Sequence, residues 1–238
     1  SALSLRYSSW SMRTWLALTH AGADFETHTV EVALGQPLSA NTDDGLVAEA
    51  RARLDARRAL GSVTGLFPVL HVGDTQIHES LAIGEWVNDA FPSAALWPED
   101  ALARARARAV CCEMMSGFTQ MRAQMSCHLF GRVPDFTPNA GARIDIARVL
   151  ELWQDALERS GGPFLFGRFS LADIMYYPVR TRFRTYGIAL PKDVEPYVAA
   201  LDAHPAVRKL ECVARQAPAI ESYDAYLRSL GGDPNAAL

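Results

Sequence analysis

The sequence contains no long apolar run, and this absence limits where the protein can reside. No stretch approaches the about eighteen uninterrupted apolar residues of a membrane-spanning helix, so we expect no such helix. The first residues also lack a basic segment followed by an apolar one, so we expect no secretory signal. Excess charge is equally scarce: a net charge of −4 disfavours nucleic acid or an anionic membrane as the main partner.

Cysteine is also rare, and the spacing of the few cysteines excludes the usual cysteine chemistries. They form no Cys-x-x-Cys pair, and no histidine lies at a spacing typical of a zinc site, so we expect no metal. We interpret them as small core residues of a protein in a reducing compartment, which indicates the cytoplasm. The four are Cys111, Cys112, Cys127 and Cys212.

The residues up to about position 91 alternate between strand and helix patterns. Short apolar or alternating runs, with Gly73-Asp74-Thr75 as a hairpin turn, predict strands. These strands are Leu3–Tyr7, Phe25–Val32, Val69–Val72 and Gln76–Ile77. Helical patterns cover Met12 to about Ala21, Leu46–Leu60 and Ser80–Ala90. The order βαβ followed by αββα indicates one α/β domain over residues 1–91.

Beyond a proline-containing linker at 92–98, every segment predicts helix, so residues 98–238 are expected to form an all-α domain. Apolar residues three or four apart predict one long helix, with the face Val110, Met114, Phe118, Met121, Met125 and Leu129. A second such face comprises Ile146, Leu150, Trp153 and Leu157. Ser170 and Asp173 can form a capping box that starts a central helix. The end of the chain, Gly231–Leu238, is expected to fray.

A cluster of serines lies where the first strand gives way to the first helix. Ser8, Ser9 and Ser11 place hydroxyls near helical N–H groups that have no backbone partner. The positive end of a helix suits an anion, and a thiolate is an anion. The alternative is that these serines serve only as a helix cap and a turn, although a cap needs only one of them.

Two further motifs are typical of a peptide-binding edge. Pro68 precedes a strand, and a cis bond after Phe67 would leave the Phe67 backbone open to pair with an extended ligand. Glu79 and Ser80 stand between a strand and a helix, with Ser80 as the expected N-cap. There they can receive an ammonium and a carboxylate of the same ligand. The alternatives are an ordinary trans proline and a serine that only caps.

Taken in order, these motifs resemble the glutathione transferase superfamily over nearly the whole chain. Residues 8–13, Ser-Ser-Trp-Ser-Met-Arg, are similar to the Ser-Ser-Cys-x-x-Arg signature of the zeta class, with Trp10 in place of the cysteine. The resemblance implies a thioredoxin-like domain followed by a helical domain, and reduced glutathione as co-substrate. It also implies a homodimer.

The resemblance assigns roles to individual positions. Counting back from Arg13 selects Ser8 or Ser9 as donor to the sulfur, and Ser11 is a further candidate. Phe67 and Pro68 would hold the cysteinyl backbone, Glu79 and Ser80 the γ-glutamyl group, and an arginine of 51–58 the glycyl carboxylate. The pocket for a small hydrophobic electrophile would be lined by Trp10, Met114, Phe118, Met121 and Arg122, although the apolar ones can equally be core.

The expected activity is transfer of glutathione to that electrophile. Two alternatives are enzymatic: a zeta-like cis–trans isomerase, and cleavage of an ether or carbon–halogen bond. The alternative from another class is a non-catalytic module that keeps the fold and binds a protein partner.

Overall fold

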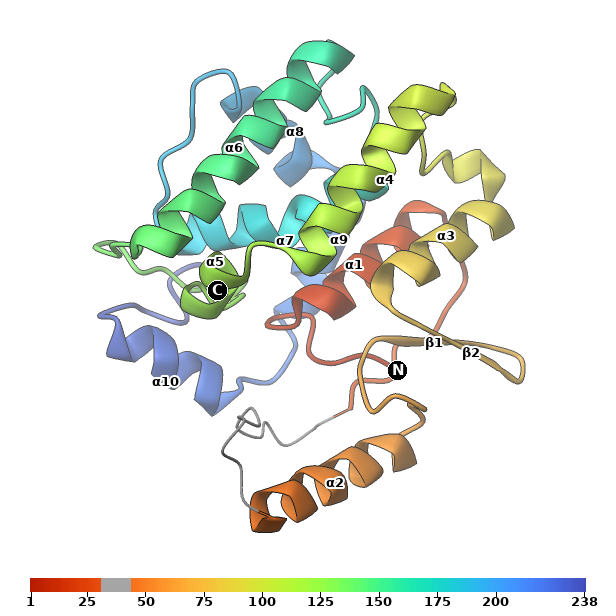
Figure 1. Ribbon diagram of the computed structural model, residues 1–238, viewed down its shortest axis with the longest axis vertical. Helices are drawn as coiled ribbons and strands as arrows, with labels where there is room; N and C mark the ends of the chain where they lie inside the picture. Colours follow the sequence, from red (N-terminus) through yellow and green to blue (C-terminus); the bar gives the residue numbers. More distant parts are fainter. Residues whose placement is uncertain (31–43) are drawn as a thin grey trace.

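The computed structural model describes residues 1–30 and 44–238. A small sheet with its helices forms the first part of the molecule, and a set of helices forms the second (Figure 1). This is the predicted architecture of a thioredoxin-like domain followed by an all-helical domain. The exact division into residues 1–91 and 98–238 stays a prediction.

The first part contains a hairpin and three helices. Its elements are α1 (Ser9–His20), α2 (Asp44–Ala59), β1 (Val69–Val72), β2 (Thr75–His78) and α3 (Ser80–Ala90). Strands β1 and β2 pair antiparallel, with Val72 opposite Thr75, and Gly73 supplies the positive φ of 55° at the turn. The hairpin and the predicted α3 are therefore confirmed.

Strand pairing at the chain start is shorter than the sequence predicts. Ser1 and Val69 exchange two backbone hydrogen bonds of 2.7 and 2.9 Å, and Ala2 bridges Thr29 in parallel. The predicted strand Leu3–Tyr7 is wrong, because the chain turns there and the Ser4 carbonyl accepts the Tyr7 and Ser8 amides. Serine hydroxyls compete for this backbone: Ser4 Oγ accepts from the Arg6 amide.

The second predicted strand, Phe25–Val32, is reduced to the bridge at Thr29 within the described residues. Glu31 and Val32 lie outside them. The Val30 amide donates to the Ala2 carbonyl, and the Val69 amide donates to the Ser1 carbonyl. The start of the chain therefore lies between the segment around Thr29 and strand β1. That arrangement sets the chain start beside Pro68.

The second part consists of helices and the loops that connect them. After the short turn η1 (Pro92–Ala94), the helices are α4 (Ala101–Ser116), α5 (Thr119–Gln124), α6 (Ala140–Ser160), α7 (Leu171–Thr185), α8 (Glu195–Ala203), α9 (Pro205–Ala214) and α10 (Glu221–Ser229). The predicted capping box of α7 is confirmed: Asp173 Oδ2 accepts from the Ser170 amide at 2.8 Å. Helix α6 carries the predicted second apolar face.

The single long helix predicted over Val110–Leu129 is wrong. Helix α4 ends at Ser116, Phe118 takes a left-handed φ of 57°, and α5 then begins. A Cβ on Gly117 would lie 2.7 Å from the Glu113 carbonyl oxygen, so this break requires glycine. The predicted apolar face still packs inward, because Met114, Met121, Met125 and Leu129 are fully buried.

The C-terminal residues 231–238 pack onto the molecule instead of fraying. Arg132 and Asp233 exchange two backbone hydrogen bonds, and the Ala237 amide donates to the Phe130 carbonyl. Arg6 Nη2 donates to Asn235 Oδ1 at 2.6 Å, which joins the tail to the start of the chain. The prediction that this segment frays is wrong, because its partners lie more than 100 residues away in the sequence and no local pattern reveals them.

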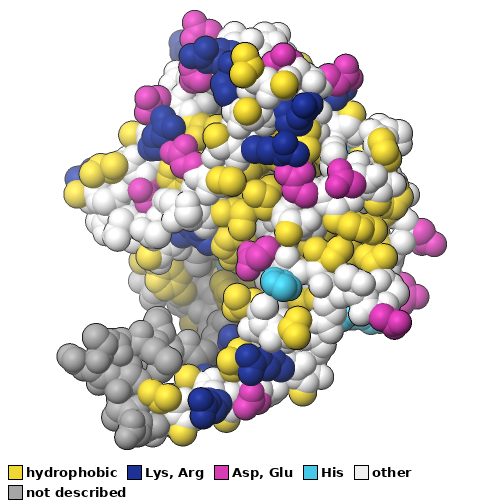
Figure 2. Space-filling view, turned by 45° about the vertical axis from the view of Figure 1, so that its right-hand side comes forward, with side chains coloured by type: hydrophobic (Ala, Val, Ile, Leu, Met, Phe, Trp, Pro, Cys, Tyr) yellow, Lys and Arg dark blue, Asp and Glu magenta, His cyan; other side chains and the backbone are white. Residues whose placement is uncertain are grey.

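Helix α1 is the central element. It contacts α3 of the first part and α7 and α9 of the second, and nine of its twelve residues are buried (Figure 1). On the outer surface, side chains of both charges are interspersed over the upper part of the molecule, where α4 and α6 lie (Figure 2). Among the helices of the described residues, none has the length and apolar character that crossing a bilayer requires.

Candidate functional site

The start of α1 is organised by two serine hydroxyls. Ser8 is the N-cap, and its Oγ accepts from the Ser11 amide at 3.3 Å and donates to Ser11 Oγ at 3.1 Å. Ser11 Oγ in turn accepts the Leu3 amide at 2.9 Å. Because Ser11 is buried and anchored, it holds Ser8 in place at the positive end of the helix.

Ser9, the neighbouring candidate, is the first residue of α1. It is 8% exposed, as is Ser8, but its hydroxyl forms no hydrogen bond within the described residues. The two serines therefore differ in environment: Ser8 belongs to an ordered hydroxyl pair, and Ser9 does not. This contrast makes each a control for the other.

Tyr7 precedes the serines and was missed at the level of sequence. Its hydroxyl donates to Asp224 Oδ1 at 2.8 Å and accepts the Ile220 amide at 3.2 Å. Burial raises the pKa of Tyr7 to about 12. The tyrosine hydroxyl is therefore committed to α10 and is a poor donor to a ligand at the start of α1.

The loop before β1 has the predicted backbone. The Phe67–Pro68 peptide is cis, as predicted. The amide and carbonyl of Phe67 form no hydrogen bond within the described chain, although Phe67 is 8% exposed. This backbone is therefore available to an added extended segment.

Glu79 and Ser80 lie beside that loop at the start of α3. Glu79, not Ser80, is the N-cap, with a φ of 70°, so the predicted N-cap role of Ser80 is wrong. Ser80 is the first helical residue; it is 2% exposed, and its hydroxyl is buried without a hydrogen-bond partner among the described residues. Such an unsatisfied hydroxyl at a helix N-terminus suits a carboxylate ligand.

Two cavities flank the start of α1. The first, about 180 Å³, is lined by Trp10, Leu66, Phe67, Pro68, Glu79 and Ser80, which are predicted glutathione residues except for Trp10 and Leu66. The second, about 330 Å³, has Tyr7 and Ser8 on one side and Ile220 and Tyr223 on the other. The structure thus brings the predicted peptide-binding residues together and places Ser8 on a separate, larger space nearby.

The predicted second-substrate residues occupy other places. Met114 and Met121 are fully buried and Phe118 is 6% exposed, so these three contribute to the core. Arg122 is half-buried, with its guanidinium 4.8 Å from the centre of the Trp10 ring. Arg13 lies 4.6 Å from the same ring centre. Trp10 and Arg122 therefore meet each other close to the first cavity.

Buried positive charge accumulates behind Trp10. Burial first, and then Arg182 and Arg122, lower the pKa of Arg13. The Arg13 Nε donates to the Met175 carbonyl at 3.0 Å, and Arg122 Nη1 donates to the carbonyls that end α4. Backbone carbonyls therefore accept the hydrogen bonds of both arginines, and the bond from Arg13 to Met175 joins the two parts of the molecule.

The predicted arginine for a glycyl carboxylate falls on α2. Arg53 pairs with Glu49 and Arg58 with Asp55 on this helix, while Arg51 is exposed. None of these contacts selects one arginine, so this assignment stays a prediction.

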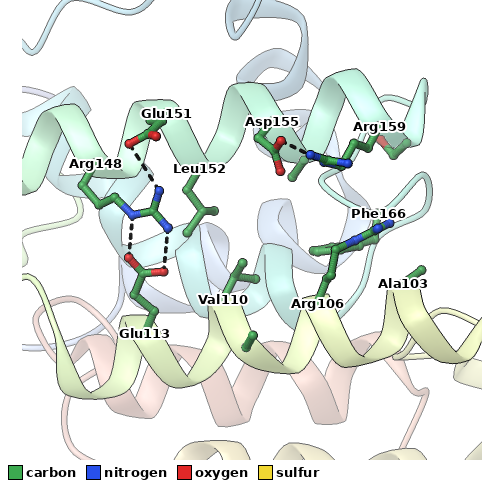
Figure 3. Close-up of a pocket in the computed structure, with 13 residues that line it drawn as sticks. Ala103, Arg106, Val110, Glu113, Arg148, Glu151, Leu152, Asp155, Arg159 and Phe166 are labelled. Atoms are coloured by element: carbon green, nitrogen blue, oxygen red, sulfur yellow. Dashed lines mark hydrogen bonds and ion pairs between the residues drawn. The ribbon is translucent and has the colours of Figure 1, made fainter.

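A further cavity of about 470 Å³ lies between α4 and α6, away from the serines (Figure 3). Most of the charged side chains that line it form ion pairs with one another: Arg148 pairs with Glu113 and Glu151, and Arg159 pairs with Asp155. Within the described residues, no group of three or more His, Cys, Asp or Glu side chains is placed to hold a metal ion.

A thioredoxin-like domain, an all-helical domain and a hydroxyl-lined helix start beside a cis-proline together define a glutathione-transferase-like protein. The model of the glutathione S-transferase N-terminal domain matches residues 7–90, and that of the C-terminal domain matches residues 99–209. The chain therefore belongs to the glutathione S-transferase superfamily. A comparison with curated proteins finds no significant match.

Solved structures agree on the fold. A glutathione transferase homolog from Burkholderia gl BGR1, with bound glutathione, is 21% identical with a TM-score of 0.65, over 91% of this chain and 97% of its own. A maleyl pyruvate isomerase, a bacterial zeta-class transferase, is 22% identical with a TM-score of 0.63, over 88% and 94%. A tau-class transferase from mango, Mangifera indica, is 18% identical with a TM-score of 0.59, over 94% of each chain.

Proposed function

We propose that the protein is an enzyme that activates the thiol of reduced glutathione and adds it to a small hydrophobic electrophile. The observation that carries the proposal is the first cavity. There, the Phe67 backbone and the Ser80 hydroxyl adjoin the N-terminus of α3, and neither has a hydrogen-bond partner in the part of the chain that the structure describes. An extended tripeptide supplies what they lack, namely backbone groups for Phe67 and a carboxylate for Ser80.

Ser8 is the group that we assign to the sulfur. It lies at the positive end of α1, lines the second cavity and already donates a hydrogen bond that a thiolate could accept instead. Ser11 holds Ser8 and takes no part in the chemistry. A hydroxyl and a helix terminus suffice, because a donor to the charged form lowers a pKa without accepting a proton.

The size of the effect can be estimated from the ionisation of a thiol. At a pKa of ~8.5, about 3% of the thiol is ionised at pH 7, and at ~6.5 about three quarters is. The thiol releases its proton to water, and the thiolate forms a C–S bond with the electrophilic carbon. That carbon either loses its leaving group with the bonding electron pair or, in an activated double bond, passes the pair to the adjacent carbon, which takes up a proton from water. Glutathione-dependent isomerisation and ether or carbon–halogen cleavage begin with the same thiolate and stay alternatives.

The test compares Ser8→Ala with Ser9→Ala in glutathione-affinity and thiol-conjugation assays. Ser8→Ala should lower kcat/KM by ~25-fold at pH 7 and move the alkaline rise of the rate to higher pH, because the thiolate fraction falls. Glutathione affinity at pH 7 should fall only about fourfold, because the bound thiolate loses its donor and the bound thiol does not. Ser9→Ala should resemble the native protein. Loss of rate in Ser9→Ala alone would transfer the role to Ser9. No glutathione binding at all would leave the non-catalytic module.

Two features of the setting complete the proposal. Within the described residues all four cysteines are unpaired, which suits a reducing compartment, so we place the protein in the cytoplasm. Family resemblance suggests a homodimer, for which sedimentation should give twice the chain mass of 26.1 kDa. Clearance of reactive electrophiles is the role that fits such an activity.

A further inference from the structure

The second cavity is enclosed by a segment that lies far away in sequence. Tyr7 and Ser8 precede α1, whereas Ile220 and Tyr223 come from the start of α10, more than 200 residues later. The Tyr7 and Tyr223 rings lie 5.0 Å apart between centres. The distance between α10 and the start of α1 therefore sets the width of the space beside Ser8.

That distance is held by one buried carboxylate. Asp224 Oδ1 accepts both the Tyr7 hydroxyl and His128 Nε2, each at 2.8 Å. The Gly131 amide donates to His128 Nδ1, so the proton of this ring is on Nε2 and points at Asp224. His128 is fully buried and Asp224 is 3% exposed, so water does not replace these bonds.

The contacts also fix Tyr7 from its other side. The Ile220 amide donates to the Tyr7 hydroxyl at 3.2 Å, and His128 packs edge-on against the Tyr7 ring at 4.8 Å. Arg6 Nη2 is 4.0 Å from Asp224 Oδ2 and supplies a positive charge behind the carboxylate. Asp224 itself does not line the cavity, so its effect must pass through Tyr7 and α10.

We propose that Asp224 is a positioning residue for the second substrate, which holds the wall formed by Ile220 and Tyr223 so that an apolar electrophile fits beside Ser8. The chemistry of the lining favours this substrate class: Leu3, Val30, Pro218 and Ala219 join the two tyrosines, and among the described lining residues Glu221 alone is charged. The inference rests on the proposed function.

Its test is a difference between two ligands, and it requires no turnover. Glutathione is compared with S-hexylglutathione, whose alkyl chain is bonded to the sulfur and should extend into the apolar space beside Ser8. Calorimetry should show that the alkyl chain raises affinity by at least about tenfold, because several CH₂ groups are buried. In Asp224→Ala this gain should fall to about twofold, while glutathione affinity stays within about twofold, because the first cavity is untouched.

Two further variants separate positioning from general damage. Asp224→Asn keeps an oxygen that can accept from Tyr7 and His128, so it should retain most of the gain. Asp202→Ala removes a half-buried carboxylate of α8 that pairs with Arg180 of α7, and it should leave the gain unchanged. With an electrophile series of growing size, Asp224→Ala should raise KM for the larger members more than it lowers kcat.

Each outcome is decisive. An unchanged alkyl gain in Asp224→Ala, or an equal loss of affinity for both ligands, overturns the proposal. If Asp224→Ala does not fold, Tyr7→Phe decides, since it removes only the hydroxyl that donates to Asp224 and must reduce the gain. If the native protein binds glutathione but shows no alkyl gain, this inference alone fails. If glutathione does not bind, the proposed function fails with it.

Discussion

At the scale of single residues, Ser80 offers the sharpest contrast between stability and binding. Its hydroxyl is buried and has no hydrogen-bond partner in residues 1–30 and 44–238, a state that is costly for the protein alone. Most buried hydroxyls in a folded protein are satisfied, so this exception points to a ligand that completes it. Stability and ligand affinity should therefore respond differently to its removal.

We predict that Ser80→Ala weakens glutathione binding by about tenfold, the effect of one lost hydrogen bond to a charged group. Thermal stability of the unliganded protein should be unchanged or slightly higher, because an unsatisfied polar atom is removed. Calorimetry and thermal unfolding measure the two effects. Thr181→Ala is the control: this buried hydroxyl donates to the Tyr177 carbonyl, so its loss should cost stability without changing affinity. Equal glutathione affinity in Ser80→Ala and the native protein would remove Ser80 from the site.

Sequence was informative where a residue's role depends on its near neighbours. The serine cap of the first helix and the Ser170–Asp173 box were predictable, because each motif lies within a few residues. The cis Phe67–Pro68 bond was predicted from the other motifs of the family resemblance and not from its near neighbours. Tyr7 was missed, because its partner Asp224 lies 217 residues away and no local pattern links them. The partnerless state of Ser80 was equally invisible, since it depends on the absence of neighbours in space.

At the scale of elements, the wrong predictions share one cause. An apolar run predicted a strand at Leu3–Tyr7, and apolar spacing predicted one helix across Gly117. In both places the pattern of apolar residues correctly predicted that the side chains are buried, since Leu5 and Met121 are core residues. Backbone geometry was instead decided by competing serine hydroxyls in one case and by a glycine in the other.

Helix α7 begins at the Ser170–Asp173 capping box, which the sequence predicted correctly. Asp173 accepts hydrogen bonds from the Leu165 amide, the Ser170 amide and the Ser170 hydroxyl, which fix the N-terminus of the helix in the core. Burial nevertheless dominates and raises the pKa of Asp173 to about 7, while these hydrogen bonds lower it. Ionisation of Asp173 therefore destabilises the folded state, and this destabilisation grows as the pH rises.

We predict that the free energy of unfolding falls as pH rises from about 4 to 8. Because the pKa of Asp173 is higher in the folded state, its contribution is complete below the unfolded pKa of 3.8 and is lost as pH passes about 7. A pKa difference of one corresponds to about 1.4 kcal/mol, so the loss amounts to a few kcal/mol. Urea unfolding at several pH values measures it.

Asp173→Asn is the matched variant for that measurement. The amide does not titrate, so the free energy of unfolding of the variant should lack this component of the pH dependence. The variant should therefore be less stable than the native protein mainly at pH 5. It also loses hydrogen bonds at the cap, which should cost about 1–3 kcal/mol. Parallel pH profiles for the two proteins would show that Asp173 is not the titrating group.

At the scale of the whole molecule, one helix belongs to both halves. Helix α1 starts at the serines, packs against α3 and buries its other face against α7 and α9. Met12 and Leu16 of this helix are fully buried, and Arg13 donates to the Met175 carbonyl in the N-terminal half of α7. The site therefore depends on docking of the helical half, because that docking fixes the helix that presents Ser8.

We predict that the protein unfolds in one cooperative transition and that residues 1–91 alone do not fold cooperatively. Removal of the helical half would expose the α7- and α9-facing side of α1, which leaves too small a core for the sheet and α3 to stabilise. Circular dichroism and fluorescence of the five tryptophans, which lie on both halves, should report the same midpoint for the intact chain. Two separated transitions, or a fragment 1–91 that melts cooperatively, would show that α1 and its serines are organised by the first half alone.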